Sequence, residues 1–265
     1  MFKTGLSTCG KEISKELFEE YAKAGLTEAE ISISPEEHEI FDIKTIVKHA
    51  NGSGVNVNSY HLLYQCTNLS KKEYAQEGID FHTEDVKRGA DAGINMFVVH
   101  ASGDITNLAT RDEFKKCAMD SIFKLAQVAE SEGVTLAVEN LPRNCIGNTS
   151  AEINELLDLH TNLKVCFDTN HISKEPLVDF IKNVGDKIIT THISDFDLID
   201  EKHWMPGEGK INWREVIKAL KNINYQGVWL YELDFACPPT IKRDKTLTCK
   251  DFADNAKMLF PQTIN

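Results

Sequence analysis

Four side chains of the kinds that bind metal ions each follow a short apolar run. They are Glu139, Asp168, His192 and Glu232, at the ends of the runs LAVE, KVCFD, KIITTH and WLYE. A carboxylate placed after such a run is costly to desolvate unless it is paired or bound to a cation. Three carboxylates brought together repel one another, and a divalent ion relieves that repulsion. We therefore expect these four residues to share one divalent metal ion. Three oxygen donors and one imidazole suit Mn²⁺, Zn²⁺, Co²⁺ or Mg²⁺.

The elements that must position these residues alternate regularly. Eight β-branched, mostly apolar runs are predicted as strands or strand-and-loop segments, at residues 2–10, 28–34, 55–62, 95–103, 135–142, 163–171, 187–197 and 227–235. Helical patterns follow them at about 15–24, 42–50, 70–92, 110–133, 149–160, 176–184, 212–222 and 250–259. Strict alternation predicts right-handed parallel crossovers. Eight units in 265 residues predict a single-domain (β/α)8 TIM barrel over residues 1–265.

The alternative fold is an open, doubly wound sheet. That fold favours a glycine-rich GxGxxG turn after the first strand, and the segment GLSTCG does not fit that pattern. Helix boundaries rest on capping signals. Ser14 is expected to begin the first helix and Gly25 to end it, and we expect caps at Ser70–Glu73, Thr110–Glu113 and Thr149–Glu152.

Further polar residues fall where strands of such a barrel end, which is where barrel enzymes build their active sites. His61 follows the third run, His100 the fourth and His171 the sixth, so we expect His61 and His100 to line a pocket. Asp195 and Asp197 follow His192 closely and either orient its ring or belong to a turn. We assign the four remaining histidines on predicted loops and helices to the surface: His38, His49, His82 and His160.

The loop KHWMPGEG, residues 202–209, is the most distinctive stretch of the chain. Pro206 and the two glycines predict a turn at which backbone approaches a ligand closely. His203 and Trp204 are candidates for contact with the face of a polyol, and the alternative is a structured surface loop.

Composition narrows the class of partner. The net charge is −12, which disfavours nucleic acid or an anionic membrane as the main partner. We expect no transmembrane helix, since the chain contains no run of about 18 consecutive apolar residues. Seven scattered cysteines without a CxxC motif indicate free thiols and a cytoplasmic protein, rather than a disulfide framework or a thiolate metal site.

The segments VEN, DTNH, HISD, KHWMPGEG and the terminal YE resemble the xylose isomerase-like barrel superfamily, which holds sugar isomerases, sugar epimerases and endonuclease IV enzymes. The similarity to the epimerases implies that Glu139, Asp168, His192 and Glu232 are the metal ligands. It implies that Glu139 and Glu232 also transfer protons, through a metal-stabilised cis-enediolate of a sugar, sugar phosphate or polyol substrate.

The resemblance also implies a set of substrate contacts. His171 and His203 would bind substrate hydroxyls, and Arg143 is the best cationic candidate for substrate contact. The epimerases carry a further arginine beyond the histidine of the seventh strand, and this chain has none between His192 and Arg214. The sugar, and the choice among epimerisation, isomerisation and dehydration, therefore stay open. The oligomeric state stays open as well, with a homodimer as one candidate because related epimerases often pair.

Two alternatives remain beside the sugar enzyme. Endonuclease IV binds three zinc ions, and this chain has candidates for many of the ligands: His61, His100, Glu139, Asp168, His171, His192, Glu201, His203 and Glu232. The net charge of −12 and the lack of Lys- or Arg-rich loops at the strand ends favour the isomerase or epimerase. The second alternative is a metal-binding barrel without catalytic activity.

Overall fold

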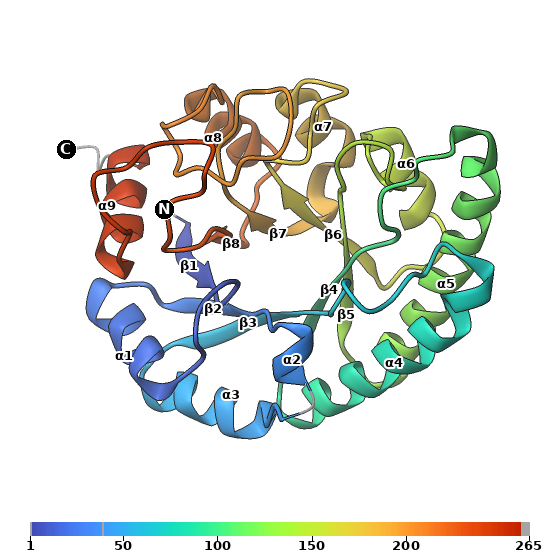
Figure 1. Ribbon diagram of the computed structural model, residues 1–265, viewed down its shortest axis with the longest axis horizontal. Coiled ribbons are helices and arrows are strands. Elements are labelled where there is room, and N and C mark those ends of the chain that lie inside the picture. Colours follow the sequence, from blue (N-terminus) through green and yellow to red (C-terminus); the bar gives the residue numbers. More distant parts are fainter. Residues whose placement is uncertain (1, 39, 261–265) are drawn as a thin grey trace.

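Eight parallel strands form a barrel surrounded by helices in the computed structural model, which describes residues 2–38 and 40–260 (Figure 1). The strands are β1 (Lys3–Ser7), β2 (Glu28–Ile31), β3 (Asn56–His61), β4 (Met96–Val99), β5 (Thr135–Glu139), β6 (Leu163–Asp168), β7 (Ile188–His192) and β8 (Val228–Tyr231). The α-helices are α1 (Lys15–Ala24), α2 (Pro35–His38), α3 (Ile43–Gly52), α4 (Lys72–Asp91), α5 (Arg111–Ser131), α6 (Ser150–Leu157), α7 (Leu177–Val184), α8 (Trp213–Asn222) and α9 (Cys249–Leu259). Short 3-10 turns lie at η1 (Leu108–Thr110) and η2 (Gly185–Lys187).

The strands are hydrogen-bonded in the order β7-β6-β5-β4-β3-β2-β1-β8, and the ring closes between β7 and β8. Closure rests on a short contact rather than a full ladder: Ile193 bridges Tyr231, and the Ile193 amide donates to the Leu230 carbonyl at 2.8 Å. The Thr191 hydroxyl donates to the Val228 carbonyl at 2.9 Å across the same seam. The predicted (β/α)8 barrel is therefore confirmed, and the open sheet is excluded.

The two faces of the strands carry different side chains. The main apolar core lies between the outer face of the barrel and the helices, whereas a small separate cluster of Val98, Ala137 and Cys166 belongs to three adjacent strands. Cys166 on β6 is the register partner of Glu139 on β5, and Ala137 lies two residues before Glu139 on the same strand. Because alternate residues of a strand share a face, this cluster lies on the same inner face of the barrel as Glu139. The barrel interior is thus apolar at β4–β6 and polar toward the C-terminal ends of the strands.

The helix ends show where local sequence signals hold. Ser14 caps α1, accepting from the Leu17 amide, and Gly25 ends the helix with φ at 91°, as predicted. Thr149 caps α6 by accepting from the Glu152 amide, also as predicted. The sequence prediction missed the one-turn helix α2 and the capping box that Thr248 forms with Asp251 before α9.

Two predicted capping boxes are wrong. Helix α4 begins after Lys71 without a side-chain cap, because the Asn68 carboxamide oxygen accepts from both the Ser70 and the Lys71 amides. Thr110 likewise makes no side-chain cap for α5, since the turn η1 runs directly into that helix. In both places the residues before the expected cap already supply a hydrogen-bonded turn.

The assignment of four histidines to the surface is only partly correct. His49 is half-buried, the side chains of His38 and His160 are only 15% and 14% exposed, and His82 is 2% exposed. His38 Nε2 lies 2.9 Å from Asp85 Oδ1. His82 lies on the buried face of α4, where it follows Ala75, Gly78 and Ile79 at helical spacing. Burial lowers the pKa of His82 to about 3.

The seven cysteines are all free, as expected. Within residues 2–38 and 40–260, no helix combines the length and the apolarity that crossing a bilayer requires.

The buried His82 predicts a specific pH dependence of stability. Its folded-state pKa lies below the ordinary value of about 6.5, so unfolded chains bind a proton that the folded protein excludes. The His82 contribution is fully present above about pH 6.5 and is lost as the pH falls toward 3. Replacing His82→Gln should reduce the loss of unfolding free energy between about pH 8 and pH 5 by about 2 kcal/mol. Urea unfolding at both pH values measures this, and His49→Gln, at a half-buried position on α3, is the control. An unchanged pH dependence in His82→Gln would contradict the assignment.

Candidate functional site

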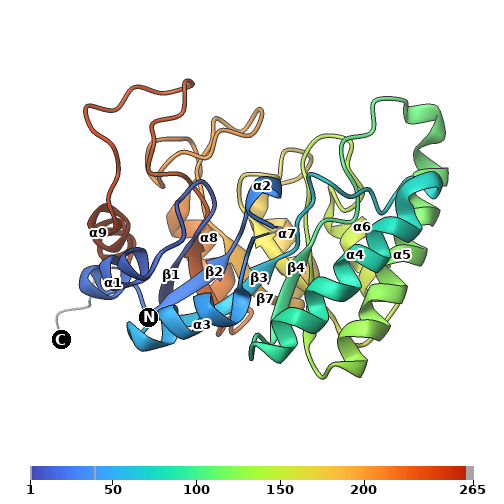
Figure 2. The same cartoon turned by 60° about the horizontal axis from the view of Figure 1, so that its bottom comes forward.

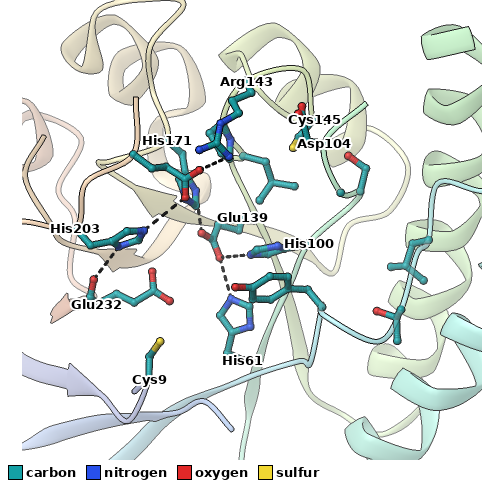
Figure 3. A pocket seen from close by; sticks show the side chains of 18 of the residues that line it. Cys9, His61, His100, Asp104, Glu139, Arg143, Cys145, His171, His203 and Glu232 are labelled. Carbon is teal, nitrogen blue, oxygen red and sulfur yellow. Dashed lines mark hydrogen bonds and ion pairs between the residues drawn. The ribbon is translucent and has the colours of Figure 1, made fainter. Parts of the chain in front are cut away.

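A cavity of about 510 Å³ opens at the C-terminal ends of the strands, with Glu139 near its centre (Figure 3). The long loops that follow β7 and β8, orange and red in Figure 2, rise at this same end of the barrel. Among the sequence-predicted site residues, those in contact with the cavity are His61, His100, Glu139, Arg143, His171, His203 and Glu232. Asp168 and His192 lie deeper, both 0% exposed.

Glu139, Asp168, His192 and Glu232 converge at the floor of this cavity. One ligand atom from each lies within 4.8 Å of every other. His192 Nδ1 is 3.3 Å from Glu139 Oε2, 3.3 Å from Glu232 Oε2 and 4.0 Å from Asp168 Oδ2. Ligands at about 2.1 Å from one ion lie roughly 3.0–3.5 Å apart, so the distances from His192 Nδ1 to Glu139 and to Glu232 already suit a shared ion.

Two buried atoms of this group have no hydrogen-bond partner within the described residues: His192 Nδ1 and Asp168 Oδ2. The second oxygen of Asp168 is occupied, because Oδ1 accepts from the Asn170 amide. Buried polar atoms are rarely left unpaired, and a bound cation would satisfy both atoms together. The residues therefore fit a divalent ion.

Asn140, directly after β5, holds Asp168 in place. Its carboxamide donates to the Asp168 carbonyl and accepts from the Asp168 amide, both at 2.9 Å. These two bonds continue the pairing of β5 and β6 beyond the ends of the strands. The backbone that carries Asp168 is therefore fixed to the backbone that carries Glu139.

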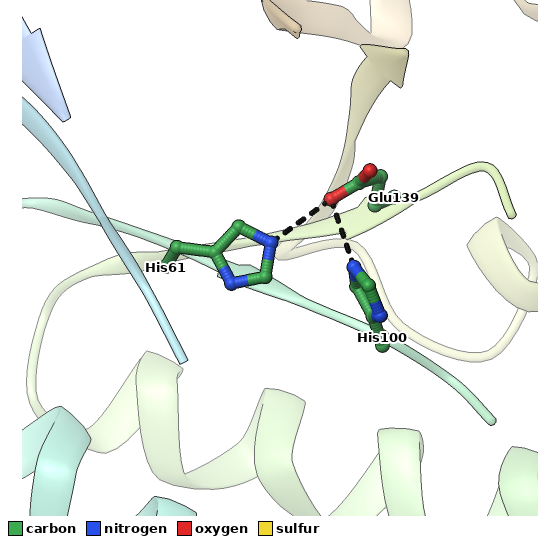
Figure 4. Close-up of side chains that lie close together, drawn as sticks. All are labelled: His61, His100 and Glu139. Carbon is green, nitrogen blue, oxygen red and sulfur yellow. Dashed lines mark hydrogen bonds and ion pairs between the residues drawn. The ribbon is translucent and has the colours of Figure 1, made fainter. Parts of the chain in front are cut away.

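Glu139 is 1% exposed and faces imidazoles on several sides. His61 Nε2 and His100 Nε2 both approach Glu139 Oε2, at 3.1 and 3.2 Å (Figure 4). His171 Nδ1 lies 3.1 Å from the other oxygen. Burial alone would raise the pKa of Glu139, but His192 and His100 outweigh burial and hold this pKa well below its ordinary value. Glu139 is thus a carboxylate base shared among imidazoles.

The pKa values of Asp168 and His61 are both raised, but for different reasons. Desolvation raises the pKa of Asp168 to about 7, and the charges of Glu139 and Glu232 act in the same direction. Desolvation opposes the charge on His61, yet its hydrogen bond to Glu139 raises the pKa of His61 to about 8. Near neutral pH the metal-free cluster therefore holds protons that a divalent ion would displace.

A second group of metal-type side chains lies on the cavity wall. His171, Glu201 and His203 also offer ligand atoms within 4.8 Å of one another. Glu201 Oε1 is 3.2 Å from His171 Nε2 and 3.5 Å from His203 Nε2. Arg143 reaches the other oxygen of Glu201 at 2.7 Å and Asp200 at 3.1 Å. Arg143, the predicted substrate contact, therefore lies at the cavity with its charge already paired.

The predicted polyol contact of Trp204 is not supported. Trp204 is not among the described residues that line the cavity, and its indole nitrogen donates to the Thr240 hydroxyl at 2.9 Å. The backbone pairing of Trp204 with Asp195 turns the ring away, while the neighbouring His203 adopts φ of 49° and reaches the cavity.

Asp195 organises this loop instead of orienting His192. Its carboxylate accepts from the Gly207 amide, the Ile211 amide and the Trp213 indole, at 2.8, 3.1 and 2.8 Å. Any Cβ at Gly209 would collide with this carboxylate, which explains the glycine. The turn alternative was thus correct for Asp195. Asp197 also serves a turn, accepting from the Ile199 and Asp200 amides.

Glu30 on β2 is a buried residue of the site that the sequence reasoning missed. Its carboxylate is 0% exposed and contacts His192 Nε2 at 2.9 Å, while the Ser59 hydroxyl donates to it at 2.8 Å. The segment EAEISIS alternates charged and apolar residues, which is typical of a strand with one solvent-facing side. In a closed barrel, the strand face that carries these charged residues points into the interior instead of into solvent. A charged residue at such a position could therefore have indicated a residue of the site.

The family comparison agrees with the architecture. The model for the xylose isomerase-like TIM barrel matches residues 18–245, and the chain belongs to this family. Over 231 residues the chain is 27% identical to D-psicose 3-epimerase of Ruminiclostridium cellulolyticum, covering 80% of this chain and 75% of that protein.

Other relatives match over shorter stretches. Protein MJ1311 of Methanocaldococcus jannaschii is 33% identical over 116 residues, which is 41% of this chain and 40% of that protein. The chain thus spans about two fifths of the length of the first curated relatives it matches. The solved structure of a D-tagatose 3-epimerase-like protein superposes with a TM-score of 0.80 at 21% identity, over 98% of this chain and 97% of the other. That likeness shows the same fold.

The geometry at the cavity floor predicts stabilisation by a divalent ion. Excess Mn²⁺ should raise the melting temperature by about 5–10 °C, because an ion at 100 times its dissociation constant adds about 2.7 kcal/mol to the folded state. EDTA should reverse the shift. His192→Ala should remove it, since Nδ1 is one of the ligand atoms, whereas His49→Gln should retain it. Differential scanning calorimetry measures all four conditions, and a Mn²⁺ shift that persists in His192→Ala would place the ion elsewhere.

Proposed function

We propose that the protein is a divalent-metal-dependent sugar isomerase or epimerase that moves a proton on a ketose or related polyol. The observation that carries the proposal is the four-residue group at the cavity floor, with His192 Nδ1 and Asp168 Oδ2 both buried and unpaired within the described part of the chain. Relatives named as D-psicose 3-epimerase support this class of reaction.

The chain's own residues account for the proton transfer. An ion at the cavity floor would supply Lewis-acid polarisation of a substrate carbonyl and its neighbouring hydroxyl. Glu139 ends β5 and Glu232 directly follows β8, with β6 and β7 between these strands in the ring, and both residues line the cavity. A sugar lying between the two carboxylates presents one face to each. One carboxylate removes the proton from carbon, and the other returns it.

The histidines around Glu139 set its protonation state. His61 and His100 donate to the same oxygen of Glu139, which stabilises the ionised form, the form that can accept a proton. His171 and His203 reach the cavity from the wall, with Glu201 between them, and are placed to contact substrate hydroxyls. Arg143 acts mainly by fixing Glu201.

The charge of the cavity favours an unphosphorylated substrate. Five carboxylates line it, at Asp104, Glu139, Glu201, Glu232 and Asp234. Arg143 is the one arginine or lysine among the described lining residues, and its guanidinium is paired with Asp200 and Glu201. A phosphate at the rim would face the exposed carboxylates of Asp104 and Asp234, with no unpaired lysine or arginine among the described residues that line the cavity. The proposed substrate is therefore a neutral sugar or one that bears an ammonium group.

The two glutamates predict a paired loss of activity. Glu139→Gln and Glu232→Gln should each lower the rate of solvent deuterium incorporation into a reactive ketose by at least about 100-fold, because each removes a general acid–base group. Thermal melting checks that both variants fold. Glu208→Gln is the matched control and should keep its rate, because Glu208 is not among the described residues that line the cavity and is paired with Arg243. Two glutamine variants with wild-type exchange would refute the assignment.

The acidic rim predicts discrimination against phosphate. For matched ketoses, kcat/KM should be at least about 10-fold higher for the free sugar than for its phosphate ester, since like charges a few Å apart repel. The double variant Asp104→Asn, Asp234→Asn should narrow this ratio, and high salt should narrow it as well. A preference for the phosphate ester would contradict the proposed substrate charge.

One specific observation favours a second candidate, an endonuclease IV-like phosphodiesterase with three zinc ions. Beside the four-residue group, His61, His100 and Glu139 form another candidate metal group, and His171, Glu201 and His203 form a third. The net charge of −12 and the acidic rim oppose a DNA substrate. Metal analysis separates the readings, because about one ion per chain fits the sugar enzyme and about three fit the nuclease. Bound metal without deuterium exchange on any sugar and without cleavage of abasic DNA would leave the non-catalytic barrel.

A further inference from the structure

Glu30 and Ser59 form a buried chain of contacts that ends at His192. The Ser59 hydroxyl, on β3, donates to Glu30 Oε2 at 2.8 Å. Glu30, on β2, places Oε1 2.9 Å and Oε2 3.1 Å from His192 Nε2, on the far side of the barrel. All three side chains are 0% exposed. Glu30 is not among the described residues that line the cavity, so it does not contact a substrate there.

The contact with Glu30 decides which nitrogen of His192 carries a proton. A carboxylate only accepts hydrogen bonds, so His192 Nε2 must donate to Glu30. The lone pair of the neutral ring is then on Nδ1, the atom that faces Glu139 and Glu232 at 3.3 Å. Nδ1 has no hydrogen-bond partner within the described residues. The ring is therefore oriented as a ligand from the opposite side.

A buried carboxylate with this arrangement is expensive, which argues for a role. Desolvating an ionised carboxylate costs several kcal/mol, and Glu30 has only Ser59 and His192 as side-chain hydrogen-bond partners within the described chain. Glu28, two residues earlier, shows the structural alternative. It is also buried, but it pairs with the Lys3 ammonium at 2.8 Å and with the Asn56 carboxamide at 2.6 Å at the other end of the barrel.

We propose that Glu30 is a positioning residue that fixes the tautomer and orientation of His192 and strengthens its Nδ1 as a donor to a divalent cation, with Ser59 fixing the Glu30 carboxylate. This role rests on the proposed metal-dependent function. Carboxylate partners of metal-binding histidines raise ligand basicity, and their loss costs about 10- to 100-fold in metal affinity or activity.

The test is Mn²⁺ affinity of the full chain, measured by isothermal titration calorimetry without substrate. Glu30→Ala should weaken binding by about 10- to 100-fold. Glu30→Gln should weaken it less, because a carboxamide oxygen still accepts from Nε2 but carries no charge. Ser59→Ala should weaken it least. Glu28→Gln is the matched control, since Glu28 is a buried, inward-facing carboxylate on the same strand, and it should retain wild-type affinity.

A second measurement separates positioning from stability and from the proposed function. Nitrogen-15 NMR of the histidines in metal-free protein, at a pH high enough for the His192 ring to be neutral, should show His192 protonated on Nε2 in wild type and without this preference in Glu30→Ala. The proposal would be overturned if folded Glu30→Ala bound Mn²⁺ with wild-type affinity. It would also be overturned if Glu28→Gln lost as much Mn²⁺ affinity as Glu30→Gln. If wild type binds no divalent ion, the proposed function fails. An unchanged His192 tautomer in Glu30→Ala would instead remove the role of Glu30.

Discussion

The structure of the site depends on keeping one buried carboxylate charged. Glu139 is 1% exposed and lies within 3.3 Å of imidazole nitrogens from His61, His100, His171 and His192. A carboxylate buried without partners would be strongly destabilising, and the imidazoles supply the hydrogen bonds and positive charge that offset its desolvation. Glu139 and these imidazoles therefore stabilise one another. The imidazoles come from the ends of β3 and β7 and from the loops after β4 and β6. The charge on Glu139 is thus balanced only when most of the barrel has closed around it.

This requirement explains the unusual interior of the barrel. Successive inward positions on β2 carry Glu28 and Glu30, which pair with polar partners from neighbouring and opposite strands. Polar contacts therefore follow one another along the barrel axis. The Lys3–Glu28 ion pair lies at one end, the contact of Glu30 with His192 comes next, and the cavity floor lies at the other end. Apolar packing between strands and helices supplies the stability that such a polar interior does not.

The sequence predicted the fold well because strands covered on both faces and amphipathic helices leave strong periodic patterns. It also predicted the four convergent residues, since a carboxylate or imidazole at the end of an apolar run is conspicuous. Glu30 escaped because the alternation of its strand suits a solvent-facing position equally well, and only the closed barrel shows that it is buried. His82 escaped because its polar side chain was assigned to the surface, although its spacing from Ala75, Gly78 and Ile79 places it on the buried face of α4. Trp204 was misplaced because its direction depends on backbone pairing with Asp195, which local sequence does not reveal.

The short contact between β7 and β8 has a consequence for local opening of the barrel. The strands join through the bridge of Ile193 with Tyr231, and His192 and Glu232 are the residues immediately beside that bridge. Any fluctuation that parts the seam separates these two side chains. A cation bound by both His192 and Glu232 would link β7 to β8. Binding of the ion would therefore disfavour local opening between these two strands. The C-terminal unit, from β8 through α9, would then exchange its amide hydrogens more slowly in the loaded protein than in the empty one.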